Sequence, residues 1–169
     1  MPLESLPIPS AWLETELLDA ATVSLIEALF VRSSKRLGTR EIALWLRDAD
    51  ALCPVLGIGD LAENFVGMFR QPLDAGLIST VLSSGQSLCE NEVATHRQHS
   101  PHLDQRLGVS TSAIVATPIF AAGNLVGVIS AVHFEEGNRF SLGDLEDFEF
   151  VAACISRFLD AVVYQELLG

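Results

Sequence analysis

Basic side chains are scarce in this sequence, and they are scattered along it. The 169 residues include 10 Lys and Arg against 22 Asp and Glu, which gives a formal net charge of -12. Without a basic stripe the chain would repel a phosphate backbone, so we exclude nucleic acid as a partner. The first residues also lack a basic stretch followed by an apolar run, the pattern of a secretory signal, so we expect a cytoplasmic protein.

Cysteine is also sparse, and the three that occur lie far apart. Cys53, Cys89 and Cys154 match neither the spacing of a metal site nor that of a disulfide framework. We therefore predict buried structural thiols and no metal site. Charged residues make up only 19% of the chain and hydrophobic residues 49%, which is too apolar for intrinsic disorder and favours one hydrophobic core.

One stretch, 113–134, has no charged side chain, but it is interrupted. Pro118 and the Gly123-Asn124 pair divide it into pieces of strand length, and Gly-Asn between apolar runs is typical of a β-hairpin. We therefore expect two adjacent core strands, 112–120 and 125–134, and no membrane segment.

The remaining patterns predict an α+β fold in one domain. Helices are expected at 11–37 with Ser10 as cap, at 76–84 ended by Gly85, and at 142–168 with Ser141 as cap. Further strands are expected at 41–47, 51–58 and 87–93, and a polar loop with room for one helical turn at 95–108. This order favours an antiparallel sheet of about five to six strands with both terminal helices on one face. We assign 1–17 to a lead that includes the start of the first helix, and 18–169 to a single domain.

Several of these segments resemble, in order, the motifs of GAF domains. The runs QPLDAGLI at 71–78 and VLSSGQSL at 81–88 are similar to the family's central signature. The segments 112–120 and 123–129 are similar to its last two strands, and 140–145 to its entry into the final helix. The resemblance covers roughly 18–160. It implies a small-molecule pocket on the sheet face away from the terminal helices, roofed by 94–111.

The resemblance and the polar residues near this roof give the candidate ligand contacts. Glu92 stands where the family usually has an Asp, and three of the four histidines recur every third residue in the roof. The full set is Glu92, His96, His99, His102, Thr111, Thr117, Ile129 and His133. A solvated loop is the preferred interpretation of the roof histidines, because Pro101 breaks the helix that would align them on a metal. For His133, which ends an apolar strand, a core histidine with satisfied hydrogen bonds is the alternative to a ligand contact.

The cofactor stays unassigned. Asn138-Arg139-Phe140 followed by Asp144 partly resembles the Asn-Lys-Phe-Asp-Glu motif of cyclic-nucleotide-binding members, but Arg replaces Lys and Leu145 replaces Glu, so an ordinary turn into a capped helix is preferred. A covalent bilin is not expected, because 94–111, where many bilin-binding members attach the chromophore, contains no cysteine. The family's free methionine sulfoxide reductases need grouped cysteines near the pocket, and here only Cys89 lies in that region.

We therefore expect a non-catalytic regulatory domain that binds a small molecule, with a ligand-free pairing module as the alternative and a reductase-type enzyme as the third reading. The last helix carries two apolar stripes, and a sheet covers only one of them. We interpret this as a homodimer through the terminal helices. The candidate interface residues are Leu18, Leu25, Leu29, Leu145, Phe148, Ala152, Ile155, Leu159 and Val162. The alternative is that the first helix alone covers the second stripe, which consists of Phe150, Val151, Cys154, Phe158 and Ala161.

Overall fold

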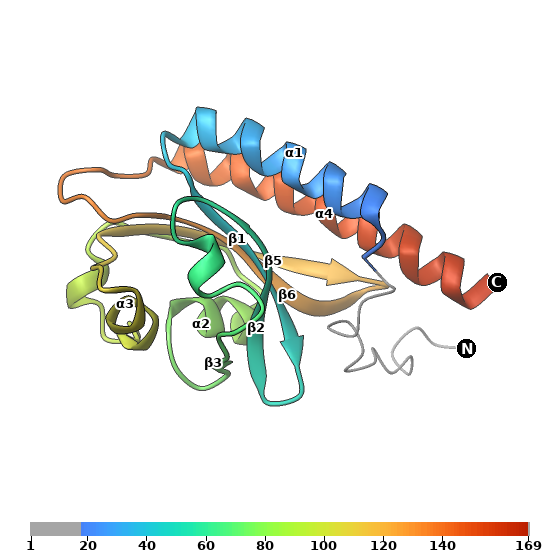
Figure 1. Ribbon diagram of the computed structural model, residues 1–169, viewed down its shortest axis with the longest axis horizontal. Helices are drawn as coiled ribbons and strands as arrows, with labels where there is room; N and C mark the ends of the chain where they lie inside the picture. Colours follow the sequence, from blue (N-terminus) through green and yellow to red (C-terminus); the bar gives the residue numbers. More distant parts are fainter. Residues whose placement is uncertain (1–17, 169) are drawn as a thin grey trace.

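The computed structural model describes residues 18–168, with side chains described through residue 165. Two long helices lie side by side on one face of a six-stranded sheet, and short helices and loops cover the other face (Figure 1). The strand order is β3-β2-β1-β6-β5-β4, and every neighbouring pair is antiparallel. The strands are β1 Glu41–Asp48, β2 Ala51–Ile58, β3 Gln71–Pro72, β4 Leu88–Glu90, β5 Ala113–Ala121 and β6 Asn124–His133. The predicted α+β sheet fold is confirmed.

Two-residue turns form the predicted β5–β6 hairpin and the hairpin between β1 and β2. Ala122 and Gly123 join β5 to β6 with φ values of 49 and 78 degrees, the positive φ pair of a type I′ turn. The turn lies one residue earlier than the predicted Gly123-Asn124, because Asn124 already pairs with Ala121 in the ladder. At the other hairpin, Ala49 (φ 49 degrees) lies between β1 and β2, and the ladder has a bulge at Trp45 opposite Pro54.

The terminal helices begin at side-chain caps. In α1, Ala20–Leu37, the Thr22 amide donates to Asp19 Oδ1 at 2.7 Å, so the helix starts after Asp19. The helix predicted over 11–37 is wrong at 18–19, which precede the helix, while the predicted start at 11 and the cap at Ser10 fall outside the described residues. In α4, Leu142–Leu168, the Asp144 amide donates to Ser141 Oγ at 3.1 Å while the Ser141 amide donates to Asp144 Oδ2 at 2.7 Å. This reciprocal capping confirms the predicted helix start.

The layer on the opposite face is built from short pieces. It contains the 3-10 turns η3 Ala62–Asn64 and η4 Val93–Thr95 and the helices α2 Leu77–Ser84 and α3 His102–Leu107. The strand predicted at 87–93 is shorter than expected, because the chain turns into η4 at Val93. The single helical turn allowed for in the roof is α3.

The sheet has an apolar core on each face. Ile42, Leu44 and Ile129 face α1 and α4, whereas Ala43 and Trp45 face α2 and α3. This division follows the two-residue alternation of a strand, and it sets which side chains can reach a pocket on either side. Among the described residues, no helix is both long and apolar enough to span a bilayer.

Candidate functional site

Two adjoining hollows lie between the sheet and α3, on the face away from the terminal helices. Their volumes are about 50 and 80 Å³. The residues that line both are Trp45 from β1, Ser130 and Val132 from β6, Leu103 and Asp104 from α3, and Thr111 just before β5. This position agrees with the pocket that the resemblance implied.

The floor of the hollows is aromatic and fixed in orientation. Trp45 stacks on Phe65 with ring centroids 5.8 Å apart and meets Phe69 edge-on at 6.3 Å. Its indole Nε1 donates a hydrogen bond to Ser130 Oγ at 2.9 Å, which ties β1 to β6 across the floor. The Ser130 hydroxyl can therefore still donate its own proton to an occupant.

One carboxylate holds the roof in place. Asp104 on α3 accepts hydrogen bonds from the amide and the hydroxyl of Thr111, at 2.7 and 2.8 Å. Its Oδ2 also lies 3.7 Å from His99 Nε2. Because Thr111 leads directly into β5, these contacts fasten the roof to the sheet.

Two further polar groups border the hollows. Glu41 lies at one end, where its Oε1 accepts a hydrogen bond from the Asp60 amide at 2.9 Å. Burial raises the pKa of the Glu41 carboxyl above its usual value, and hydrogen bonds from the Asp60 and Leu61 amides oppose part of this rise. At the other end, the hydroxyl of Ser100 is buried without a hydrogen-bond partner.

Of the predicted roof contacts, the structure brings His99 and Thr111 to the hollows. Glu92 points outward, with 68% of its side chain exposed and Arg139 Nη1 at 3.0 Å. His96 lies 3.7 Å from Glu90, and His102 is exposed. The three histidines do not converge, and the described residues hold no group of three or more metal-ligating side chains.

The three candidates on the hairpin strands face the wrong way. Ile129 packs in the core beneath the terminal helices, Thr117 pairs with it across the ladder, and His133 lies on the same face of β6. His133 stacks on Phe140 with centroids 4.4 Å apart, and burial lowers its pKa, as fits a core histidine. Because side chains alternate between the two faces of a strand, the neighbouring residues Ser130 and Val132 face the hollows instead.

The family model for the GAF domain matches residues 22–159. The chain belongs to the GAF family. Over 127 residues it is 28% identical to the cone cGMP-specific 3′,5′-cyclic phosphodiesterase subunit alpha′ of Bos taurus, a match that covers 73% of this chain and only 14% of that protein.

Solved structures share the fold of this GAF domain. The GAF domain of a phosphoenolpyruvate-protein phosphotransferase from Coxiella burnetii is similar with a TM-score of 0.75 at 16% identity, covering 94% of each chain. The free methionine-R-sulfoxide reductase of Neisseria meningitidis, in complex with its substrate, is similar with a TM-score of 0.71 at 16% identity, covering 92% of this chain and 86% of that one. At this identity the likeness shows the fold alone.

The cysteines of this GAF domain do not gather at the hollows. Cys53 is buried in β2, whereas Cys89 and Cys154 are half-buried, less covered than predicted. All three are free thiols, and no cysteine is among the described residues that line either hollow. Burial raises the pKa of the Cys53 and Cys89 thiols, which disfavours the reactive thiolate.

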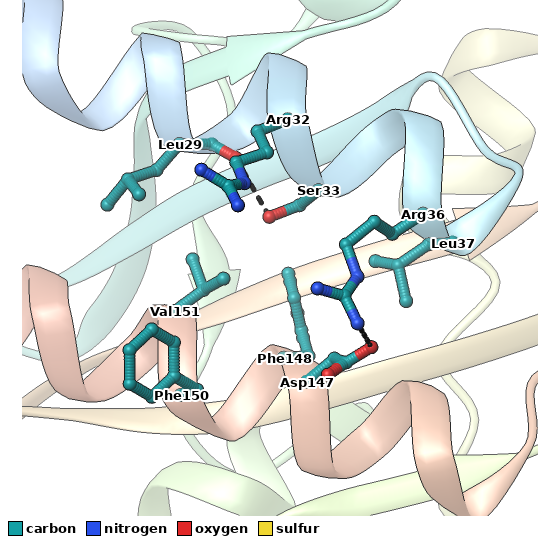
Figure 2. Close-up of a pocket in the computed structure, with 9 residues that line it drawn as sticks. All are labelled: Leu29, Arg32, Ser33, Arg36, Leu37, Asp147, Phe148, Phe150 and Val151. Atoms are coloured by element: carbon teal, nitrogen blue, oxygen red, sulfur yellow. Dashed lines mark hydrogen bonds and ion pairs between the residues drawn. The ribbon is translucent and has the colours of Figure 1, made fainter.

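A groove of about 180 Å³ runs between α1 and α4 on the outer surface of the helix layer. Figure 2 shows Leu29 and Arg32 from α1 opposite Phe150 and Val151 from α4. The end of the groove is closed by an ion pair between Arg36 Nη2 and Asp147 Oδ2 at 2.7 Å. The groove therefore combines apolar side chains with the charged groups of Arg32, Arg36 and Asp147.

The stripe of α4 predicted as the dimer seam is mostly sheet-facing, which corrects that assignment. Phe148, Ala152, Ile155 and Leu159 are at most 2% exposed, and they pack with the sheet core. Leu18 precedes α1, and Leu18 and Leu145 pack partly against the same core. The interface candidates that remain accessible to solvent are Leu25, which is 51% exposed, and Leu29 and Val162, which are half-buried. Of the second stripe, Phe150 is 71% exposed and Ala161 is exposed, whereas Val151, Cys154 and Phe158 are half-buried, and Val151 and Phe158 pack against the core.

Proposed function

We propose that this GAF domain is a non-catalytic regulatory module that binds a small molecule in the two hollows and transmits the change to a homodimer formed through α1 and α4. The observation that carries the proposal is the partly closed site itself. An oriented aromatic floor and the hydroxyls of Ser100, Ser130 and Thr111 converge there under a fastened roof. Apolar walls with a few placed polar groups are typical of ligand sites.

The cysteine chemistry supports a regulatory rather than an enzymatic role. A reductase of the kind named among the structural neighbours needs a thiol that reaches its substrate. Here the thiols lie away from the hollows, and the pKa values of Cys53 and Cys89 are raised. We therefore propose no catalytic residue.

A cyclic nucleotide is the weaker ligand candidate, although the bovine relative is named for cGMP. The described lining residues include no Lys or Arg to pair with a cyclic phosphate. Arg139, in the motif that partly resembles the nucleotide-binding one, points away and pairs with Glu92.

A contact route from the hollows to α4 supports the signalling part of the proposal. Ser130 and Val132 of the hollows lie on β6, which turns at Ala122 into β5. The Phe120 amide donates to Ser156 Oγ at 3.0 Å, and the Ala122 amide donates to Asp160 Oδ1 at 2.7 Å. A ligand that displaces β6 thus acts on α4 through the hairpin.

A second copy of this chain is the proposed occupant of the helix face. Leu25, Val31 and Phe150 expose 51, 48 and 71% of their surface on the two helices. Exposed large apolar side chains on these two helices are the kind of surface that an interaction site covers. A two-fold axis along the groove would place each Phe150 against the partner's α1 and complete a four-helix arrangement. The cytoplasmic location stays a prediction.

A thermal-shift screen of metabolites and cyclic nucleotides tests ligand binding. A true ligand adds about 2.7 kcal/mol at a hundredfold excess over its Kd and raises Tm. Ser130→Leu, which fills the hollows, should abolish the shift, whereas Ser83→Leu, at an exposed position on α2, should keep it. A compound that stabilises both variants equally binds elsewhere. If no compound in a broad library raises Tm while the protein is dimeric, the ligand-free pairing module is the correct reading.

A further inference from the structure

The charges around the two hollows have one sign. Glu41 and Asp104 are the carboxylates that line them, and the described lining residues include no Lys or Arg. His99 is the single imidazole among those lining residues. The net charge of -12 on the whole chain adds a potential of the same sign. An anion entering this site meets this negative potential and finds no Lys or Arg among the described lining residues.

Neither carboxylate is paired with a Lys or Arg side chain among the described residues; the basic side chain beside Asp104 is His99, whose Nε2 lies 3.7 Å from its Oδ2. Glu41 accepts a hydrogen bond from the Asp60 backbone, and the neighbouring Arg40 instead points to the Asp60 carboxylate at 3.4 Å. That Arg40–Asp60 pair is exposed, with 79 and 77% of the side chains open to solvent. Asp104 takes its hydrogen bonds from Thr111, which is neutral. Backbone amides, Thr111 and His99 contact these carboxylates, but no Lys or Arg forms an ion pair with either of them among the described residues.

Aromatic rings complete the surroundings. Trp45, Phe65 and Phe134 line the smaller hollow together with Glu41 and Asp104. The face of an aromatic ring attracts a cation through its quadrupole, most strongly for Trp, and aromatic cages with nearby carboxylates recognise alkylated ammonium groups. The stacking of Trp45 on Phe65 fixes these faces before any ligand arrives.

The size of the hollows restricts the occupant further. The two hollows adjoin, and their volumes of about 50 and 80 Å³ together approach the roughly 150 Å³ cavity that accommodates benzene, so they have room for one small organic group. From charge, aromatic lining and size together, we infer that the site takes a small organic cation, an alkylammonium group, in preference to a neutral or anionic molecule of the same shape. This inference rests on the proposed ligand-binding function and names its ligand class.

Titration calorimetry on the full chain with a matched pair of probes tests the inference. Choline and 3,3-dimethylbutan-1-ol have nearly the same shape and differ in charge, and acetate serves as the anionic probe. We expect choline to bind, and the neutral isostere and acetate to bind at least about tenfold more weakly. Sodium chloride at equal ionic strength controls for screening.

Two isosteric variants connect the selectivity to the site. Glu41→Gln keeps an acceptor for the Asp60 amide and removes the charge, so the variant should fold and lose roughly tenfold in choline affinity while the neutral isostere is unaffected. Glu27→Gln makes the same charge change at an exposed position of α1 on the other face and should leave choline binding unchanged.

The outcomes separate this inference from the proposed function. If the neutral isostere binds as tightly as choline, or acetate binds more tightly, the cation preference is wrong while the hollows remain a binding site. The cation preference is also wrong if the metabolite screen finds only neutral or anionic ligands and Ser130→Leu abolishes their binding. If neither the probes nor the library bind, both the inference and the ligand-binding function fail.

Discussion

Replacing Phe150 with Glu should dissociate the dimer without unfolding the protein. The side chain is 71% exposed at the groove between α1 and α4, so in the monomer it contributes little to the core. A surface substitution of this kind usually changes the free energy of unfolding by no more than about 0.5 kcal/mol. At an interface the same ring would be covered by a second copy of the chain.

The magnitude follows from the area involved. Covering the exposed part of a phenylalanine, on the order of 100 to 150 Å² of apolar surface, contributes roughly 3 kcal/mol, and a two-fold interface contains this contact twice. The substitution also places a carboxylate in the seam. Since every 1.4 kcal/mol is a factor of about ten, we expect the dimer Kd to rise by at least about a hundredfold.

Sedimentation velocity across a concentration series measures this change, with thermal unfolding run in parallel. Met68→Glu, at an exposed position of the opposite layer, should leave the dimer intact. Leu159→Ala, at a fully buried site, should instead cost about 2 to 5 kcal/mol of stability. The reasoning is refuted if the unmodified protein is monomeric at micromolar concentration, or if Phe150→Glu stays as dimeric as the wild type.

Three further changes test the core and the roof. Because burial lowers the pKa of His133, protonation opposes folding, so stability should fall as pH drops below about 6.5. His133→Gln should reduce this dependence of Tm on pH, whereas the control His102→Gln should leave it unchanged. Asp104→Ala removes two hydrogen bonds from Thr111 and should lower the free energy of unfolding by about 1 to 3 kcal/mol. In this variant the Thr111 amide should exchange faster than the amides of residues 125–132, and equal protection of both would contradict the role of Asp104 as the roof anchor. Gly127→Ala would place a Cβ in steric overlap with the Trp45 carbonyl oxygen, so β1 and β6 must separate and Tm should drop. Gly143→Ala, with only Ser141 Oγ nearby at 3.6 Å, should be tolerated.

The elements could be predicted because local chemistry marks their ends. Gly85 ends α2 with φ 66 degrees, and the reciprocal capping of Ser141 and Asp144 starts α4. Gly123 lies in the β5–β6 turn. Each of these signals acts within a few residues and does not depend on distant packing.

The faces of the elements could not be predicted in the same way. Strands β5 and β6 are buried on both sides, so their sequences alternate between two kinds of apolar residue and do not reveal which set faces the hollows. The predicted ligand contact on this strand was therefore Ile129, one residue away from Ser130, which lines the hollows. The pairing of Trp45 with Val128, which only the folded sheet supplies, fixes the correct face.

For the same reason the sequence did not show which apolar stripe of α4 faces the sheet, since Ile155 and Phe150 are equally apolar. The clue was among the polar residues of that helix. Ser156 and Asp160 are half-buried, and they accept hydrogen bonds from backbone amides at the hairpin end of the sheet. Polar residues that cap strand ends therefore mark the inner edge of this helix.

These two hydrogen bonds restrict the motions that are open to α4. Ser156 and Asp160 lie one helical turn apart and hold two amides of the β5–β6 hairpin. Spinning the helix about its own axis would break both bonds, whereas pivoting it together with the hairpin keeps them. Rotation of α4 about its axis therefore costs these two hydrogen bonds, and a tilt shared with the hairpin does not.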